Sequence, residues 1–396
     1  MHVLLLSFYF PPDLSAGSFR MEALVTALQQ RLGANSRITV ITTRPNRYGS
    51  FDAQAPATEV QGGITVHRID LPAHQSGMRD QARAFATFAW KARELVAHER
   101  PDAVVATTSR LMTGVLGAWA ARNRRAPLYL DIRDIFVDTI GDVLPQRATW
   151  FLKPLFSALE KWAVRSATRV NLVSPGFLPY FQSRYPDCTF SVLSNGVDDA
   201  FLEQRPVQQA QNPKPPSPIH VLYAGNIGEG QGLHHILPAL AKLLGEEVRF
   251  TVVGDGGRRV QLESALAGLP RHAVTLLAPV KRAELIALYN EADVLLVHLN
   301  DLPAFEKVLP SKLFEYAATG KPIWAGLAGF PARFAKHEIE NVAVFNPCDA
   351  AGAVAALKTL RLHTCDRGAF VDKYRRTHIM NSMAEDIVRL GVESSA

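Results

Sequence analysis

The segment 305–325, FEKVLPSKLFEYAATGKPIWA, combines residue types suited to holding a diphosphate beside a ribose ring. Pro310 and Ser311 predict the start of a helix, because proline is tolerated in the first turn. The free backbone N–H groups and the dipole of that helix end favour an anion, and Lys312 adds a positive charge. Glu315, about one turn further on, could accept hydrogen bonds from two ribose hydroxyls. The alternative is a capped amphipathic helix that leaves Glu315 in solvent.

Glycine residues follow three of the predicted strands and precede helical patterns. Without a Cβ atom, glycine lets a phosphate approach backbone N–H groups and the positive end of the next helix. The candidate binding residues in these loops are Gly17, Gly225, Asn226, Gly254, Asp255 and Gly256. The loop at Gly17 lacks the G-x-G-x-x-G spacing of dinucleotide sites, and a single loop of this kind is equally consistent with a plain turn. Three of them at strand ends predict a site for phosphate and nucleotide.

Charged residues gather at the end of the apolar stretch 128–132. They are Asp131, Arg133, Asp134 and Asp138. Charges at the C-terminal end of a buried strand suit an acceptor or leaving-group site. Arg133 and Asp134 are therefore the candidate catalytic residues, and a structural salt-bridge network is the alternative.

The elements that position these residues follow from the alternation of apolar, β-branched runs with longer stretches of helical period. This alternation predicts an α/β fold of two Rossmann-like domains, each a parallel sheet covered by helices, facing a cleft. The predicted strands are 2–7, 37–42, 103–107, 128–132 and 169–173, then 219–223, 248–253, 274–277, 294–298, 322–325 and 341–345. A stretch rich in Pro and Gln indicates a linker at 206–218, which places the domains at 1–205 and 219–373. The amphipathic segment 374–390 is expected to be a closing helix.

The composition excludes several classes of protein. The 396 residues are 47% hydrophobic and 20% charged, which is globular and more than one core usually organises. Three cysteines without a C-x-x-C pair predict a reducing cytosol instead of a disulfide framework or a zinc site. No stretch reaches the roughly 20 apolar residues of a membrane-spanning helix. The net charge of +6 lies mostly in the first half without an aromatic-interleaved basic stripe, so it favours an anionic membrane surface or a phosphorylated acceptor over nucleic acid.

The sequence gives little support for metal chemistry, because it has neither a D-x-D nor an H-E-x-x-H motif. His234 and His235 open a helix without a carboxylate nearby, which predicts a surface or capping role. No metal and no other cofactor is expected.

Three motifs together, PSKLFEYAATGKPI, VVGDGG and AGNIGEGQGL, resemble the nucleotide-binding half of glycosyltransferase family 4. SNGVDDAF at 194–201 is similar to the segment that precedes the interdomain linker in that family. Within the family, the chain is most similar to bacterial enzymes of O-antigen and surface-polysaccharide synthesis, such as N-acetylfucosamine transferases. The resemblance covers nearly the whole chain. It implies a GT-B fold with the helix 374–390 packing back on the first domain, a metal-independent reaction and retention of anomeric configuration.

The resemblance also implies the reaction. An N-acetylated amino sugar would move from a nucleotide diphosphate donor, UDP by analogy, to a lipid-linked or saccharide acceptor, in the cytoplasm or at the inner face of the cell membrane. The chain departs from the family at three positions: Lys307 replaces the first glutamate of an E-x7-E pattern, and Asn226 and Gln231 replace an arginine and a lysine. Lys312 is then the candidate to compensate the charge of the diphosphate.

Two other functions stay open on the sequence: a nucleotide-sugar epimerase of the same fold, and a sugar-nucleotide-binding protein without turnover. A further open question concerns 149–166, where apolar residues recur at helical spacing with basic residues beside them. The apolar residues are Phe151, Leu155, Leu159 and Trp162, and the basic ones are Lys153, Lys161 and Arg165. This face could dock on anionic lipid or pack against the domain's own sheet.

Overall fold

A computed structural model describes residues 1–33, 37–46, 54–72, 78–138, 146–202, 218–270 and 272–393. The chain forms two compact units, unit 1 from Met1–Asn195 with Arg376–Ala396, and unit 2 from Gly196–Arg375. Residues 196–202, which the sequence analysis assigned to the first domain, belong to unit 2. The reason is a contact between segments distant in the sequence, because the backbone N–H of Val197 donates to the Tyr374 carbonyl oxygen at 2.7 Å and Phe201 lies in the core of unit 2. Most of the predicted linker, 206–217, lies outside the described residues.

Unit 1 is built on one sheet with the strand order β3-β4-β2-β1-β5-β6-β7-β8. Its strands are β1 (His2–Leu6), β2 (Arg37–Thr43), β3 (Thr58–Gln61), β4 (Ile64–Ile69), β5 (Ala103–Thr107), β6 (Leu128–Ile132), β7 (Arg169–Leu172) and β8 (Phe190–Ser191). All neighbouring pairs are parallel except β3 with β4. The central strands β1, β5 and β6 are almost completely buried, which explains their continuous apolar sequences.

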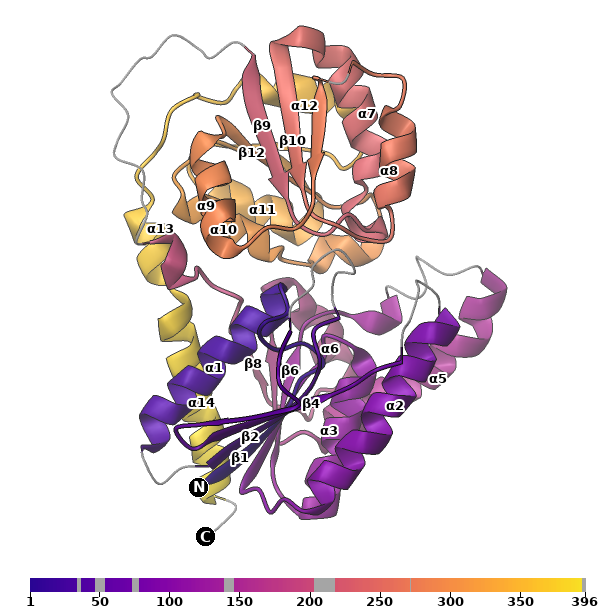
Figure 1. The fold of residues 1–396 in the computed structure, drawn as a ribbon, viewed down its shortest axis with the longest axis vertical. Helices are drawn as coiled ribbons and strands as arrows, with labels where there is room; N and C mark the ends of the chain where they lie inside the picture. The colour runs from indigo at the N-terminus through magenta and orange to yellow at the C-terminus, as the bar shows by residue number, and fades with distance from the viewer. Residues whose placement is uncertain are drawn as a thin grey trace. The chain divides into compact units, whose positions relative to one another are not determined.

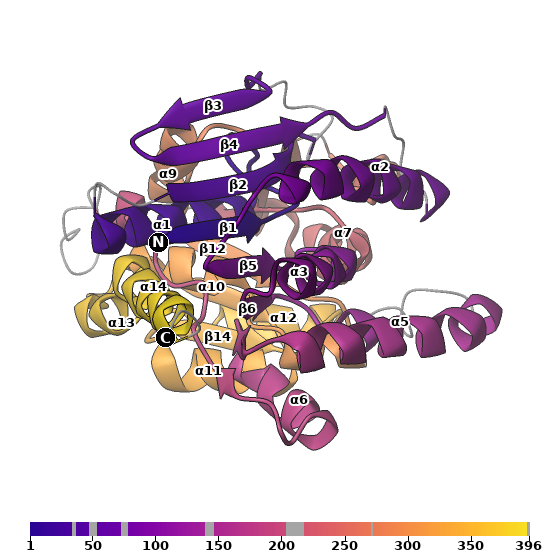
Figure 2. The same ribbon diagram turned by 90° about the horizontal axis from the view of Figure 1, so that it is seen from below.

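Helices cover both faces of this sheet (Figures 1 and 2). The helices are α1 (Ala16–Leu32), α2 (Met78–Ala97), α3 (Leu111–Arg124), α5 (Gln146–Ser166), α6 (Leu178–Arg184) and α14 (Arg376–Glu393). Helices α2, α3 and α5 lie side by side over one face, and α1 and α14 lie together over the other (Figure 2). The segment predicted as a closing helix at 374–390 is thus α14, and its Met380, Met383 and Ile387 share a core with α1, β1 and β2.

Unit 2 has a six-stranded, wholly parallel sheet with the order β11-β10-β9-β12-β13-β14. Its strands are β9 (Ile219–Ala224), β10 (Val248–Val253), β11 (Val274–Leu277), β12 (Val294–His298), β13 (Ile323–Gly326) and β14 (Val342–Phe345). Its helices are α7 (Leu233–Leu244), α8 (Arg259–Leu266), α9 (Arg282–Glu291), α10 (Ser311–Ala318), α11 (Gly329–Glu338), α12 (Ala350–Leu357) and α13 (Gly368–Lys373). One core forms with α9, α10, α11 and α13, and a second forms with α7, α8 and α12. The prediction of two α/β halves with parallel sheets is confirmed.

The strand orders locate the place in each unit where a ligand is expected. In an open α/β sheet, ligands bind outside the carboxyl ends of the strands, where the order of connection reverses. This reversal falls between β1 and β5 in unit 1 and between β9 and β12 in unit 2. The loops that follow these four strands therefore frame the candidate sites.

None of the helices in the described part of the chain is sufficiently long and apolar to cross a bilayer.

Candidate functional site

The loops after β9 and β10 in unit 2 pack backbone against backbone. Gly225 N–H donates to the Val253 carbonyl oxygen at 2.9 Å, and a Cβ atom on Gly254 would lie only 1.8 Å from the carbonyl oxygen of Gly225. Gly254 and Gly256 also have φ angles of +151° and +156°, which L side chains rarely adopt. The glycines are therefore required for the approach of the two loops to each other, whether or not a phosphate also contacts them.

Two amides lie where the resemblance leads us to expect cations. Asn226 Nδ2 donates to Gln231 Oε1 at 2.8 Å, so the two side chains bind each other across the loop after β9. This loop is also joined to the loop after β12, because Asn300 Nδ2 donates to the Glu229 carbonyl oxygen at 2.9 Å. Both loops at the reversal of strand order in unit 2 are thus fixed, and neither amide adds positive charge there.

Helix α10 starts at Ser311, after Pro310, as the sequence predicts. No side chain caps its first turn by a hydrogen bond, which leaves this turn without a side-chain acceptor. Helix α10 is also tied to the loop after β9: the Ala224 N–H donates to the Tyr316 hydroxyl at 3.0 Å, directly before Gly225. The candidate residues of this helix and the glycine loop therefore lie at the same edge of the unit 2 sheet.

Lys312, Glu315 and Tyr289 form a compact polar cluster behind the first turn of α10. Lys312 Nζ donates to Glu315 Oε2 at 2.7 Å and to the Tyr289 hydroxyl at 2.9 Å, and this hydroxyl donates to Glu315 Oε2 at 3.1 Å. Burial raises the pKa of the Tyr289 hydroxyl well above its usual value, so it stays a donor. The alternative of a Glu315 in solvent is wrong, because only 7% of this residue is exposed.

The cluster leaves specific atoms available to a ligand. Every hydrogen bond that Glu315 accepts from a described side chain ends on Oε2, which leaves Oε1 without a partner among them. The Lys312 side chain is 24% exposed and so still accessible. A ribose hydroxyl on Oε1 and a phosphate near Lys312 would both fit this arrangement. Tyr289 could not be predicted from local sequence, because its partner Glu315 lies 26 residues away in the chain.

In unit 1, the charged residues at the end of β6 separate into two groups. Asp131 is fully buried and paired with the fully buried Arg20, with Oδ1 and Oδ2 each 3.0 Å from a guanidinium nitrogen. It also accepts from Asn171 Nδ2 at 2.8 Å. The alternative of a structural ion pair therefore holds for Asp131. Arg133 and Asp134 follow it on the loop, where the Arg133 N–H donates to Thr108 Oγ1 at 3.0 Å and Asp134 is exposed.

The structure brings Gly17 and Arg133 together at the first turn of α1. A Cβ atom on Gly17 would lie 3.6 Å from Arg133 Nε and 2.9 Å from the hydroxyl oxygen of Ser109, a residue that the sequence analysis missed. Burial lowers the pKa of the Arg133 guanidinium to about 10, which still leaves it charged at neutral pH. The TTSR sequence directly after a predicted strand was the available signal for Ser109.

The expectation that no carboxylate lies near His234 and His235 is wrong. Glu229 lies with both histidines in the one group of the described residues whose ligand atoms are all within 4.8 Å of one another. A metal ion would have to compete for Glu229 with Arg258, whose Nε donates to the same carboxylate, and with Asn300, whose Nδ2 lies 3.4 Å from it. The geometry therefore allows a cation here, but the carboxylate already has partners.

A buried histidine at the end of β12 should make the stability of unit 2 depend on pH. The Cys348 N–H donates to His298 Nε2 at 3.0 Å, so the ring proton is on Nδ1 and is donated to the Gln231 carbonyl oxygen at 2.7 Å. Burial lowers the pKa of His298 from 6.5 to about 4. The unfolded chain therefore binds more protons than the folded one between these values. Stability should be complete above pH 6.5 and fall towards pH 4, by up to about 3 kcal/mol.

Urea unfolding across this range measures the effect, with His298→Asn as the control. The amide keeps a donor near the Nδ1 position and removes the titration, so the variant should be less stable but less dependent on pH. An identical pH dependence in both proteins would contradict the assignment.

Comparison with known proteins agrees with the fold. Residues 18–196 match the family described as glycosyl transferase 4-like domain, and residues 204–368 match the family described as glycosyl transferases group 1. The chain therefore belongs to the glycosyltransferases of GT-B fold.

Two curated relatives align over part of their length. The chain is 35% identical over 100 residues to the putative colanic acid biosynthesis glycosyl transferase WcaI of Escherichia coli K12, covering 25% of the chain and 24% of the relative. It is 27% identical over 190 residues to the 2-deoxystreptamine glucosyltransferase of Streptomyces kanamyceticus, covering 44% of the chain and 47% of the relative. The matches thus span about a quarter and about half of the curated relatives.

Solved structures of similar fold align over nearly the whole chain. HepE of Anabaena, in complex with UDP and glucose, has a TM-score of 0.68 at 17% identity and covers 98% of this chain and 100% of its own. WaaG, a glycosyltransferase involved in lipopolysaccharide biosynthesis, has a TM-score of 0.66 at 14% identity. The alignment covers 98% of this chain and 99% of WaaG. At these identities the likeness establishes the fold alone, and it confirms the predicted GT-B class.

Proposed function

We propose that this glycosyltransferase is a retaining enzyme that takes an N-acetylated amino sugar from a UDP-linked donor. The donor assignment is based on the Lys312–Glu315–Tyr289 cluster at the start of α10, where no side chain caps the helix and Glu315 Oε1 is available to a ribose hydroxyl. The complex of HepE with UDP and glucose supports the choice of uridine. The choice of an amino sugar and of retention follows the resemblance of the motifs to family 4.

In the proposed reaction, the bond between the anomeric carbon and the donor phosphate oxygen breaks, and its electron pair stays on the diphosphate. The acceptor hydroxyl oxygen bonds to the anomeric carbon on the same face and gives its proton to the departing diphosphate. The growing negative charge is stabilised by the start of α10 and by Lys312. No protein base is needed in this scheme, and no metal or cofactor takes part in it.

Incubation with a panel of nucleotide sugars and saccharide acceptors tests this function. Release of UDP together with a glycosylated acceptor, unchanged by EDTA, is the expected result. An epimerised donor would indicate an epimerase, and binding without turnover would indicate a sugar-nucleotide-binding protein. Loss of turnover with EDTA would contradict the metal-independent scheme and direct attention to Glu229, His234 and His235.

Glu315→Gln should weaken UDP binding roughly ten- to hundredfold, because the amide loses the charge-assisted hydrogen bonds to ribose. Tyr289→Phe is the matched control, since it removes a partner of Oε2 and keeps the carboxylate. Calorimetry should give a smaller loss for the tyrosine variant. If UDP affinity is unchanged in the glutamine variant, Glu315 does not contact the nucleotide.

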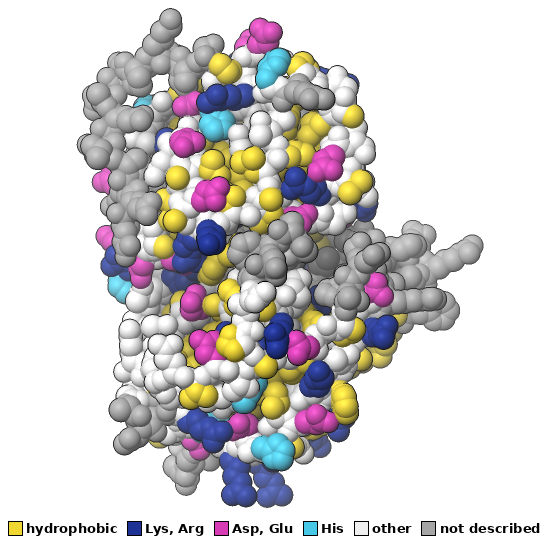
Figure 3. Space-filling model, viewed as in Figure 1, with side chains coloured by type: hydrophobic (Ala, Val, Ile, Leu, Met, Phe, Trp, Pro, Cys, Tyr) yellow, Lys and Arg dark blue, Asp and Glu magenta, His cyan; other side chains and the backbone are white. Residues whose placement is uncertain are grey.

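The acceptor is proposed to be a lipid-linked saccharide used in bacterial surface-polysaccharide synthesis, with the enzyme in the cytoplasm or at the inner face of the cell membrane. WcaI and WaaG, named for colanic acid and lipopolysaccharide biosynthesis, support this choice of pathway. Nucleic acid is not a proposed partner. On the face shown in Figure 3, basic and acidic side chains of the described residues are interspersed, without a continuous basic field.

Helix α5 is the proposed contact with anionic lipid. Its Ala163 and Val164 are buried, but Leu155 is 54% exposed and Trp150 is 73% exposed. Lys153 is exposed beside them, while the side chain of Phe151 lies outside the described residues. Exposed apolar side chains next to a cation fit an anionic bilayer surface.

Leu155→Ser is therefore expected to reduce co-sedimentation with anionic vesicles while leaving UDP binding unchanged. Leu243→Ser is the matched control, because Leu243 is a comparably exposed leucine, at 61%, on α7 of unit 2. Equal binding of the natural protein to neutral and anionic vesicles, or to neither, would count against docking.

A further inference from the structure

The first turn of α1 lies against two side chains from neighbouring strand ends. Ser109 follows β5 and Arg133 follows β6, and each lies within van der Waals distance of the position where Gly17 would carry a Cβ atom. Strands β1, β5 and β6 are adjacent in the sheet, and the order of connection reverses between β1 and β5. Three strands that are neighbours in the sheet thus bring the start of α1, the Ser109 hydroxyl and the Arg133 guanidinium to the expected ligand position of unit 1.

Ser109 and Arg133 each have a buried polar atom whose hydrogen-bonding capacity is unused among the described residues. The Nη1 atom of Arg133 and the hydroxyl oxygen of Ser109 are buried without a hydrogen-bond partner among the described residues, and so is the hydroxyl of Ser18 in the first turn of α1. Buried polar atoms are nearly always paired, and a buried charge without a partner is costly. A cluster of such atoms at the carboxyl ends of the strands therefore indicates a ligand-binding position.

The balance of charge defines the ligand as an anion. The buried carboxylate of Asp131 is already paired with Arg20, so it is not available to Arg133 as a hydrogen-bonded partner. Asp134 and Arg376 also influence Arg133, with opposite charges that offset each other, so the positive charge of Arg133 itself remains. The remaining N–H groups of the first turn of α1 also favour negative charge. A phosphate group matches a guanidinium, a hydroxyl and a helix start in a way that a neutral sugar does not.

We propose that Ser109, Arg133 and the first turn of α1 bind a phosphate group of one of the two substrates, with Gly17 leaving room for its oxygens. This inference rests on the proposed transferase function, and it changes the role expected for Arg133 from reacting group to phosphate ligand. The phosphate belongs to the donor diphosphate or to a phosphorylated acceptor, which present the same chemistry to this site.

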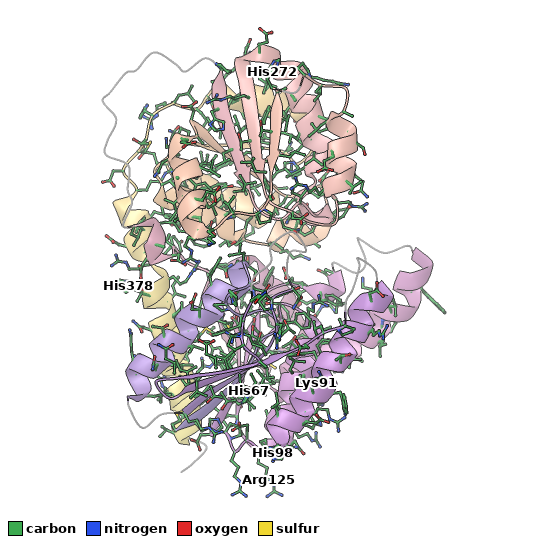
Figure 4. The ribbon with its side chains drawn as sticks, in the orientation of Figure 1. His67, Lys91, His98, Arg125, His272 and His378 are labelled. Carbon is green, nitrogen blue, oxygen red and sulfur yellow. The ribbon has the colours of Figure 1, made fainter. Side chains whose placement is uncertain are left out.

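Binding of inorganic phosphate to the full chain, measured by calorimetry, is the first test. Arg133→Gln should weaken it roughly ten- to hundredfold, because a charge-assisted contact is lost, and Ser109→Ala roughly two- to tenfold. Arg125→Gln is the matched control, because it removes the same charge from an exposed position of unit 1. Figure 4 shows the Arg125 side chain pointing away from the body of the protein. Phosphate binding that is unchanged in both Ser109→Ala and Arg133→Gln would overturn the proposal.

Titration of UDP against phosphate then identifies the source. If the site holds the donor diphosphate, UDP should displace phosphate, and Ser109→Ala should weaken UDP binding. If the site holds an acceptor phosphate, UDP and phosphate should bind together, and Ser109→Ala should raise the KM for a phosphorylated acceptor alone. Gly17→Ala gives an independent steric check, since its methyl group should weaken phosphate binding in either case.

Phosphate binding and sugar transfer are measured separately, so either one can be lost while the other remains. A natural protein that transfers sugar while phosphate binding is insensitive to Ser109 and Arg133 contradicts only the phosphate site. A protein that binds phosphate through these residues but transfers no sugar to any acceptor contradicts the function and keeps the site.

Discussion

Replacement of Asp131 by alanine is expected to lower the free energy of unfolding of unit 1 by about 3 to 5 kcal/mol. The reason is that the Arg20 guanidinium, which is fully buried, would lose the only carboxylate paired with it among the described residues. Arg20 also donates to the carbonyl oxygens of Leu193 and Ser194, so it cannot turn towards solvent without breaking these bonds. The uncompensated charge, more than the lost contact, accounts for the size of the effect.

Urea unfolding followed by tryptophan fluorescence measures this loss, since Trp90, Trp119, Trp150 and Trp162 report on unit 1. Asp134→Ala is the matched control, because it removes a neighbouring but exposed carboxylate and should change stability by less than about 0.5 kcal/mol. Equal stability of the two variants would show that Asp131 is not essential to the buried network.

Replacement of Lys312 by alanine is expected to reduce turnover by about 10² to 10³, and donor affinity as well. Asn226 and Gln231 supply no charge to the site, so Lys312 at the start of α10 is the cation that we propose to stabilise the departing diphosphate. The same change leaves Glu315 without its ion-pair partner. Lys312→Arg should restore activity only in part, because the planar guanidinium differs from an ammonium in reach and geometry.

Lys307→Ala is the comparison for this effect. Lys307 ends the short 3-10 helix at Pro303–Lys307, before α10, and its replacement should reduce kcat less than that of Lys312. The measurement is steady-state kinetics on both variants together with calorimetry of UDP binding. Greater damage in the Lys307 variant would place the diphosphate nearer the preceding segment.

The sequence did not predict β3, β4 or β8 of unit 1, of which β3 is exposed along its whole length and β8 has only two residues. The sequence was sufficient to predict the other strands, because a strand buried on both faces is a continuous apolar run that is visible without knowledge of its neighbours. It also located the start of α10 correctly from Pro310 and Ser311. Both results depend on local sequence alone.

Partners distant in the sequence could not be predicted in this way. Asp131 and Arg20 are 111 residues apart, and only the folded sheet shows that one buries the charge of the other. Ser109 follows a predicted strand, but this position alone does not distinguish it, and it becomes a candidate only beside Gly17 and Arg133. The boundary of the domains was misplaced for the same reason, since Val197 is tied to unit 2 through Tyr374.

The position of α14 has a consequence for the newly made protein. Met380, Met383 and Ile387 complete the core that α1 forms with β1 and β2, so unit 1 lacks part of its interior until these residues have left the ribosome. All of unit 2 emerges before that point and contains both of its own cores. The nascent chain should therefore fold its second unit first, with the apolar face of α1 uncovered and in need of protection until α14 has left the ribosome.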